Sequence, residues 1–201
     1  GFTSVLSGMG TALKAAAAAT AAAVAGAATA IGALTTKAIE GYAAQEQLVG
    51  GVETLFKTSS DTVVGYANDA YKTAGMSANE YMETVTSFSA SLLASMNNDT
   101  AAAAEKANVA ITDMSDNANK MGTDISLIQN AYNGFAKQNY TMLDNLKLGY
   151  GGTKEEMQRL LDDASKLSGI KYDISSYSDV VDAIHVVQTE MGITGTTAKE
   201  A

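Results

Sequence analysis

Two pairs of neighbouring carboxylates are the first side chains in this sequence that could do chemistry. Glu155 with Glu156, and Asp162 with Asp163, would suit acid–base catalysis if burial or a close neighbour raised the pKa of one member. The glutamates fall in the first turn of an expected helix, where the helix dipole favours negative charge. The aspartates fall off the apolar face of the same helix. We therefore predict solvated and capping roles for all four.

Asp113, Asp116 and His185 could bind a metal or act in catalysis, but the sequence offers them no partners. The two aspartates are three residues apart, and no calcium-loop glycine or third ligand follows them. His185 is the only histidine and the chain has no cysteine, so zinc sites and catalytic triads lack companion residues. We predict that His185 packs beside the apolar stripe of its helix, and we expect no metal and no cofactor.

A glycine-rich segment before Lys154 looks like a phosphate-binding loop. Its residues are Gly149, Tyr150, Gly151, Gly152 and Thr153. A P-loop needs four residues between its first glycine and the Gly-Lys pair, and it follows a strand. Here the spacing differs and a helix is expected to precede the segment. We therefore predict a flexible turn between two helices, and a chain that is not an enzyme.

The composition predicts that helices position these residues. Average usage would give about ten prolines in a chain of this length, and there are none. Because proline ends or kinks helices, its absence from an alanine-rich chain favours long helices. The net charge is −9, and the sequence shows no basic patch, so we expect no specific binding of nucleic acid.

Apolar periodicity and capping residues predict the order of the helices. We expect a long helix from about residue 4 to the high forties, with a break at Gly50–Gly51. Further helices are expected over 61–74, 77–96, 100–121, 125–135, 142–146, 153–167 and 176–191. Leu167 and Met191 are expected to point inward. A short strand is allowed only at 170–174.

These elements predict an all-α fold with two parts. Residues 1–50 would form a long Ala-rich N-terminal helix, and residues 51–201 a compact multi-helix region with Gly-rich turns. The sequence opens on Gly1, and Thr197 to Glu200 have the spacing of a capping box at a helix start. We therefore expect both ends to be cut from a longer protein.

Residues 15–34 carry no charge and contain thirteen alanines. Twenty residues can span a membrane, but the three larger apolar side chains contribute only about −1 to −2 kcal/mol to insertion. Small residues four apart also let helices approach closely. A buried bundle helix, self-association inside a protein sheath and a transmembrane anchor therefore stay open. The candidate contact residues are Ala22, Gly26, Ala30, Ala28 and Gly32.

Several runs in the second half of the chain carry a family resemblance. They are Ile-Thr-Asp-Met-Ser-Asp-Asn (111–117), Met-Gly-Thr-Asp (121–124), Tyr-Asn-Gly-Phe-Ala-Lys-Gln-Asn-Tyr-Thr-Met-Leu-Asp-Asn-Leu (132–146), Lys-Leu-Gly-Tyr-Gly-Gly-Thr-Lys-Glu-Glu-Met-Gln-Arg-Leu-Leu (147–161) and Gly-Ile-Thr-Gly-Thr-Thr-Ala-Lys-Glu-Ala (192–201). In content and order they resemble the core region of tail tape measure proteins of tailed phages. The ungapped run from Tyr132 to Leu161 is the most specific.

The resemblance implies a structural virion protein with no catalytic residues in this region. Such proteins are long and mostly helical, fill the tail tube in three or six copies, set tail length and leave ahead of the DNA. The implied partners are further copies of the chain, the tail tube protein, distal tail or tail-tip proteins and the host membrane. The implied locations are the tail, the host cytoplasm during assembly and the host envelope on ejection. The alternative is a membrane-active, pore-forming helical protein that uses residues 15–34.

Overall fold

The computed structural model describes residues 43–200, with side chains up to residue 198. The chain divides into two compact units, Gly1–Glu46 and Gln47–Ala201. The described residues are helical with connecting turns and contain no strand, which confirms the all-α prediction for this part of the chain. Residues 15–34 and the candidate contact residues within them, from Ala22 to Gly32, lie outside the described residues.

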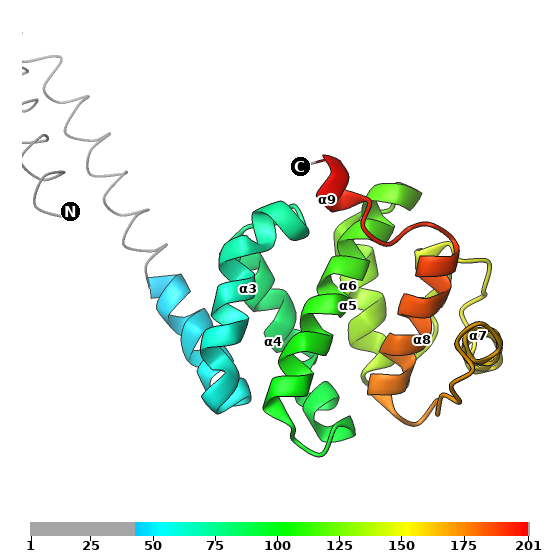
Figure 1. The fold of residues 1–201 in the computed structure, drawn as a ribbon, viewed down its shortest axis with the longest axis horizontal. Coiled ribbons are helices and arrows are strands. Elements are labelled where there is room, and N and C mark those ends of the chain that lie inside the picture. Colours follow the sequence, from blue (N-terminus) through cyan, green and yellow to red (C-terminus); the bar gives the residue numbers. More distant parts are fainter. Residues whose placement is uncertain (1–42, 201) are drawn as a thin grey trace, which may run out of the picture. The chain divides into compact units, whose positions relative to one another are not determined.

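The second unit is built from helices joined by short connections (Figure 1). After a helical stretch at residues 47–56, the elements are η1 (Lys57–Ser59), α3 (Ser60–Thr73), α4 (Ala78–Ser95), α5 (Thr100–Met121), α6 (Ile125–Phe135), η2 (Leu143–Leu146), α7 (Lys154–Ser168), α8 (Tyr177–Glu190) and α9 (Thr197–Glu200). α7 is seen end-on in Figure 1, beside α8, which is its main packing partner. None of the helices among residues 43–200 is both long and apolar enough to cross a membrane.

The helices begin and end where local chemistry predicts. Five of them start after a polar residue whose side chain accepts a hydrogen bond from a backbone amide of the first turn. These residues are Ser77, Asp99, Asp124, Thr153 and Ser176. Gly122 and Gly169 follow α5 and α7 with φ of 63° and 74°, a left-handed conformation that glycine adopts without strain.

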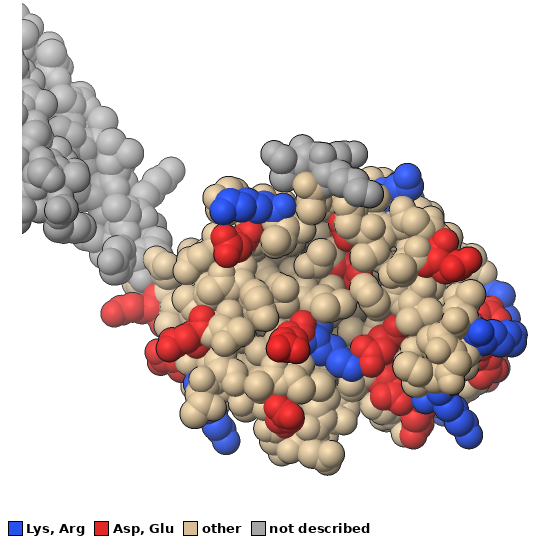
Figure 2. Space-filling model, in the orientation of Figure 1, with Lys and Arg blue, Asp and Glu red and all other residues tan. Residues whose placement is uncertain are grey.

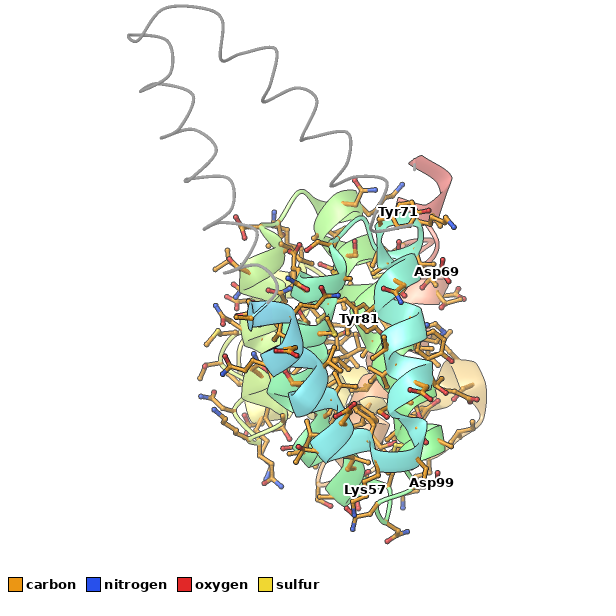
Figure 3. The ribbon with its side chains drawn as sticks, turned by 90° about the vertical axis from the view of Figure 1, so that its left-hand side faces the viewer. Lys57, Asp69, Tyr71, Tyr81 and Asp99 are labelled. Carbon is orange, nitrogen blue, oxygen red and sulfur yellow. The ribbon has the colours of Figure 1, made fainter. Side chains whose placement is uncertain are left out.

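α5 lies at the centre of the unit and packs against α3, α4, α6 and α8. Its inner face carries Ala103, Ala107, Ala110 and Met114, all of which are buried. Small side chains on this face let the neighbouring helices approach closely. At one end of the unit, the start of α5 lies near η1, where the Ser59 and Thr100 hydroxyl oxygens are 3.0 Å apart. Figure 3 shows Lys57 and Asp99 at this end.

The predicted helix break at Gly50–Gly51 is wrong, because residues 43–56 form one helical stretch. Val52 and Phe56, one turn apart, are both fully buried, so packing outweighs the low helix propensity of two glycines. A Cβ on Gly51 would lie 3.5 Å from Thr86 Cγ2 of α4, which shows how closely α4 passes this position. The chain turns instead at Lys57, where φ is 50°.

Two predicted core residues are also wrong, and the strand that the sequence allowed at residues 170–174 is not formed. Leu167 is 50% exposed and Met191 is 44% exposed. Leu167 lies in the last turn of α7, and Met191 directly follows α8. Residues 170–173 form no regular structure, and Ile174 lies in a turn. Helices flank this segment on both sides, so it has no strand to pair with.

Candidate functional site

Buried polar side chains on α5 are the most distinctive chemical feature of the described residues. Asp113, Asp116 and Asn117 are each at most 1% exposed. Asp116 and Asn117 lie three and four residues after Asp113, so each is next to Asp113 on the helix surface. Each contacts a segment near the C-terminal end of the chain. We call these three residues, together with His185 and Gln188 of α8, the α5 polar cluster.

Asp113 and His185 join α5 to α8. His185 Nδ1 lies 2.8 Å from Asp113 Oδ2; the Asp113 side chain is 1% exposed and the His185 side chain 38%. Burial raises the pKa of the Asp113 carboxyl. The hydrogen bond to Asp113 raises the pKa of the His185 imidazole. Both shifts favour a proton shared between the two side chains.

The amide side chains of Asn117 and Gln188 make a second link between the same helices. Asn117 Nδ2 donates to Gln188 Oε1 at 2.7 Å and to the backbone oxygen of Leu146 in η2 at 3.0 Å. Gln188 Nε2 donates to the backbone oxygen of Asp113 at 3.2 Å. Three elements that are distant in sequence are therefore joined by uncharged hydrogen bonds inside the core.

Asp116 holds the segment that follows α8, which we call the C-terminal strap (residues 193–198). Its carboxylate accepts from the backbone amides of Gly195 at 2.5 Å and Thr197 at 2.8 Å. The sequence predicted Thr197 as the cap of the last helix, but Thr197 lies inside α9, and its hydroxyl oxygen is 3.3 Å from that of Ser115. The carboxylate that satisfies these amides comes instead from α5, about 80 residues earlier in the chain.

Replacing Asp116 by asparagine should weaken the strap. One carboxylate oxygen becomes an amide NH₂ that cannot accept, so Asp116→Asn leaves one backbone N–H of the strap unpaired and costs about 1–3 kcal/mol. Hydrogen exchange should rise first at residues 193–197. Asp99→Asn is the matched control, because asparagine caps a helix as well as aspartate does. This control substitution should change the free energy of unfolding by only about 0.3 kcal/mol. Equal effects of the two substitutions would contradict the role of Asp116.

Three buried polar atoms in the unit have no protein partner among the described residues. They are Asp113 Oδ1, Asn117 Oδ1 and the Tyr132 hydroxyl. Burial raises the pKa of Tyr132, and the charge of Asp113 raises it further. No group of three or more His, Asp or Glu side chains in residues 43–200 is placed to hold a metal ion. The α5 polar cluster therefore links helices and presents one half-exposed imidazole to solvent.

The glycine-rich turn is held by side chains, whereas we expected a flexible turn. Arg159 donates to both carboxylate oxygens of Glu156, at 3.0 and 2.6 Å, and to the backbone oxygen of Gly149 at 2.8 Å. Its guanidinium carbon also lies 4.4 Å from the ring centre of Tyr150. Arg159, with the amide of Gly151, lowers the pKa of Glu156 to about 2. Thr153 caps the α7 N-terminus by accepting from the amide of Glu156, and the Glu156 carboxylate accepts from the amide of Gly151 in the turn before the helix.

The other acidic candidates lie on the surface of α7. Glu155 is exposed in the first turn, and Asp162 accepts from Gln158 at 3.0 Å. Asp163 accepts from Lys166 at 2.8 Å and from the Tyr150 hydroxyl at 3.0 Å, and Lys166 lowers its pKa. Acidic and basic side chains are interspersed on the face shown in Figure 2. These carboxylates are placed as caps and surface ion pairs.

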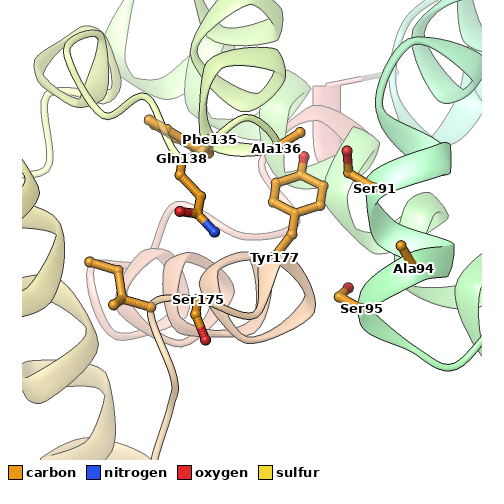
Figure 4. Close-up of a pocket in the computed structure, with 9 residues that line it drawn as sticks. Ser91, Ala94, Ser95, Phe135, Ala136, Gln138, Ser175 and Tyr177 are labelled. Carbon is orange, nitrogen blue, oxygen red and sulfur yellow. The ribbon is translucent and has the colours of Figure 1, made fainter.

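An uncharged hollow of about 320 Å³ lies between α4, the end of α6 and the start of α8 (Figure 4). Phe135 and Tyr177 form its apolar part, and Ser91, Gln138 and Ser175 add polar groups. The Tyr177 hydroxyl donates its hydrogen bond within the protein, to the backbone oxygen of Tyr132 at 3.2 Å. The hollow therefore offers neutral hydroxyl and amide groups and no charge.

Comparison with known proteins found no matching family model, no similar curated protein and no similar solved structure. The α5 polar cluster was not predicted from the sequence, in which Asp113 and Asp116 have the spacing of two calcium ligands but no third ligand. A partial signal was present: Asn117 falls on the same helix face as Ala110 and Met114, and Asp113 lies at the border of that face. A polar residue in such a stripe must find a buried partner.

Proposed function

We propose that this chain belongs to a tape measure protein of a phage tail, which sets tail length inside the tail tube and leaves it ahead of the DNA. The proposal rests on the resemblance of the runs given above, three of which contact one another in the folded unit. Asp116, in the run 111–117, binds the backbone of the run 192–201, and Asn117 binds Leu146 of the run 132–146. Runs that are far apart in sequence thus depend on one another in the fold.

The physical properties of the chain suit this role. A helix advances about 1.5 Å per residue, so a chain of uninterrupted helix acts as a ruler whose length follows residue number. Residues 47–200 fold back on themselves, so they do not make such a rod. We infer that this unit is a folded end of the ruler, and that the Ala-rich helix predicted from the sequence would be part of the ruler. The partners would be other copies of the chain, the tube subunits and tail-tip proteins.

The test is made in the phage or prophage that encodes the full-length protein. Deleting residues 15–34, or duplicating them, should shorten or lengthen the tail by about 30 Å in electron micrographs, if those twenty residues are helical along the tube axis. Gly152→Ala, which alters the folded unit without changing the number of residues, is the control and should leave the length of any tails formed unchanged. Tails of unchanged length in both length variants, or particles without this chain, would contradict the proposal. Liposome leakage by the isolated chain, abolished by Gly26→Lys, would favour the pore-forming alternative.

A further inference from the structure

We propose that His185 and Asp113 form a proton-controlled latch between α8 and α5, which is firm while the pair holds a proton and loosens once that proton is lost. The latch joins residues 72 positions apart in sequence. It rests on the geometry of the pair and does not depend on the function proposed above.

The Asp113 carboxylate is removed from solvent. The side chain is 1% exposed, and its Oδ2 lies 2.8 Å from the imidazole. The other oxygen has no protein partner in the described part of the chain. A buried carboxylate without a nearby cation is strongly unfavourable. His185 is therefore the group that makes an ionised Asp113 tolerable inside the unit.

The His185 imidazole, by contrast, is accessible to solvent. The His185 side chain is 38% exposed and borders a surface hollow of about 240 Å³. Ile170, Tyr172 and Val186 form much of the wall of this hollow. Protons can therefore exchange between solvent and the imidazole while Asp113 stays buried.

Acidic side chains outnumber basic ones around the His185 imidazole. On α5, Asp116 adds a second buried carboxylate near Asp113. On α8, Asp182 lies one turn before His185 and pairs with Lys106 of α5 at 2.5 Å. Asp179 of α8 and Lys171 line the same hollow, and Tyr132 of α6 contributes a neutral phenol on the inner side. The carboxylates Asp113, Asp182 and Asp116 all favour the protonated imidazole.

The direction of the pH effect follows from the two pKa shifts. The pKa of His185 and the pKa of Asp113 are both raised, so the folded unit keeps a proton that the unfolded chain releases. The part of this stabilisation that comes from His185 is complete below the ordinary pKa of histidine and is lost as the pH rises through the raised pKa of His185. The Asn117–Gln188 link is uncharged and persists, so α8 loosens without detaching.

The imidazole can be followed directly, because His185 is the only histidine in the 201-residue chain. An NMR titration of its ring protons should give a pKa above that of an unperturbed histidine. Asp113→Asn should return this pKa toward the ordinary value, because the buried negative charge is removed. A wild-type pKa at or below the ordinary value would overturn the latch, and this measurement needs no variant.

Hydrogen exchange tests whether the proton controls the helix. After correction for intrinsic exchange, opening of residues 177–190 should increase from pH 5.5 to pH 8.5, by up to about tenfold for each unit of pKa difference between the folded and unfolded states. α3 serves as the internal reference. His185→Gln, which keeps a hydrogen-bonding side chain without the charge, should abolish the change. Glu190→Gln, an exposed charge change on the same helix, should not. A wild-type pH profile in His185→Gln, or an equal increase in α3, would overturn the proposal.

Discussion

Replacing Gly152 by alanine is expected to destabilise the second unit by about 3 kcal/mol, since the new methyl group has no room. An ideal Cβ at this position would lie 2.2 Å from the backbone oxygen of Thr141 and 2.9 Å from its carbonyl carbon. A backbone group cannot rotate away as a side chain can. Thr141 is itself held, because its amide donates to Asn139 Oδ1 at 3.1 Å. The turns before η2 and before α7 would have to separate.

The neighbouring glycine supplies the control for this prediction. A Cβ on Gly151 would lie 3.6 Å from Glu156 Cγ, which is ordinary van der Waals contact. Gly151→Ala should therefore change the free energy of unfolding by no more than about 0.5 kcal/mol. Both variants can be compared with the parent chain by urea unfolding followed by circular dichroism. Similar losses for the two substitutions would show that the close approach at Gly152 is not the cause.

The second large effect is expected for a leucine of α7. Leu160 is fully buried, so Leu160→Ala removes apolar contacts, leaves a cavity and should cost about 2–5 kcal/mol. Leu167 lies on the same helix and is 50% exposed, so Leu167→Ala should stay within about 0.5 kcal/mol of the parent. Thermal unfolding of the two variants measures the difference. A large loss of stability for Leu167→Ala would contradict this and show that Leu167 is buried, as the sequence predicted.

The helix boundaries could be predicted because their causes are local. Ser77 and Asp99 accept hydrogen bonds from amides three residues later, and Gly122 ends α5 in a left-handed conformation. Each of these features depends on a few neighbouring residues, so the sequence displays it directly. The periodic apolar residues of α4 and α5 are local in the same sense, because a helical repeat brings them to one face.

The incorrect predictions concern positions whose structure depends on residues that are distant in sequence. Gly50 and Gly51 have low helix propensity, yet both are helical, because the burial of Val52 and Phe56 stabilises the helix at this point. Leu167 fits the apolar repeat of α7, but it lies in the last turn of the helix, where residues 166–169 are all exposed. Periodicity shows which side chains share a face, and it does not show how far the neighbouring helix reaches.

The α5 polar cluster could be predicted only in part. The helical repeat places Asn117 within the apolar face of α5 and Asp113 at its border, so the sequence shows that these two need buried partners. Asp116 lies away from that face, and only the structure shows that it is buried. Those partners, His185 and Gly195 among them, lie 70 to 80 residues away. No local pattern connects the two ends of such a contact.

The sequence by itself determined the all-α class and, from α3 to α8, the helix starts and stops and the residues that share a helix face, because propensity, capping and periodicity act over a few residues. Only the tertiary structure decided that α5 is central, that Asp113 meets His185 and that Asp116 binds the strap. These contacts depend on the packing of whole helices against one another. Their physical basis is burial: a polar group removed from water must be satisfied by whichever segment the fold brings to it.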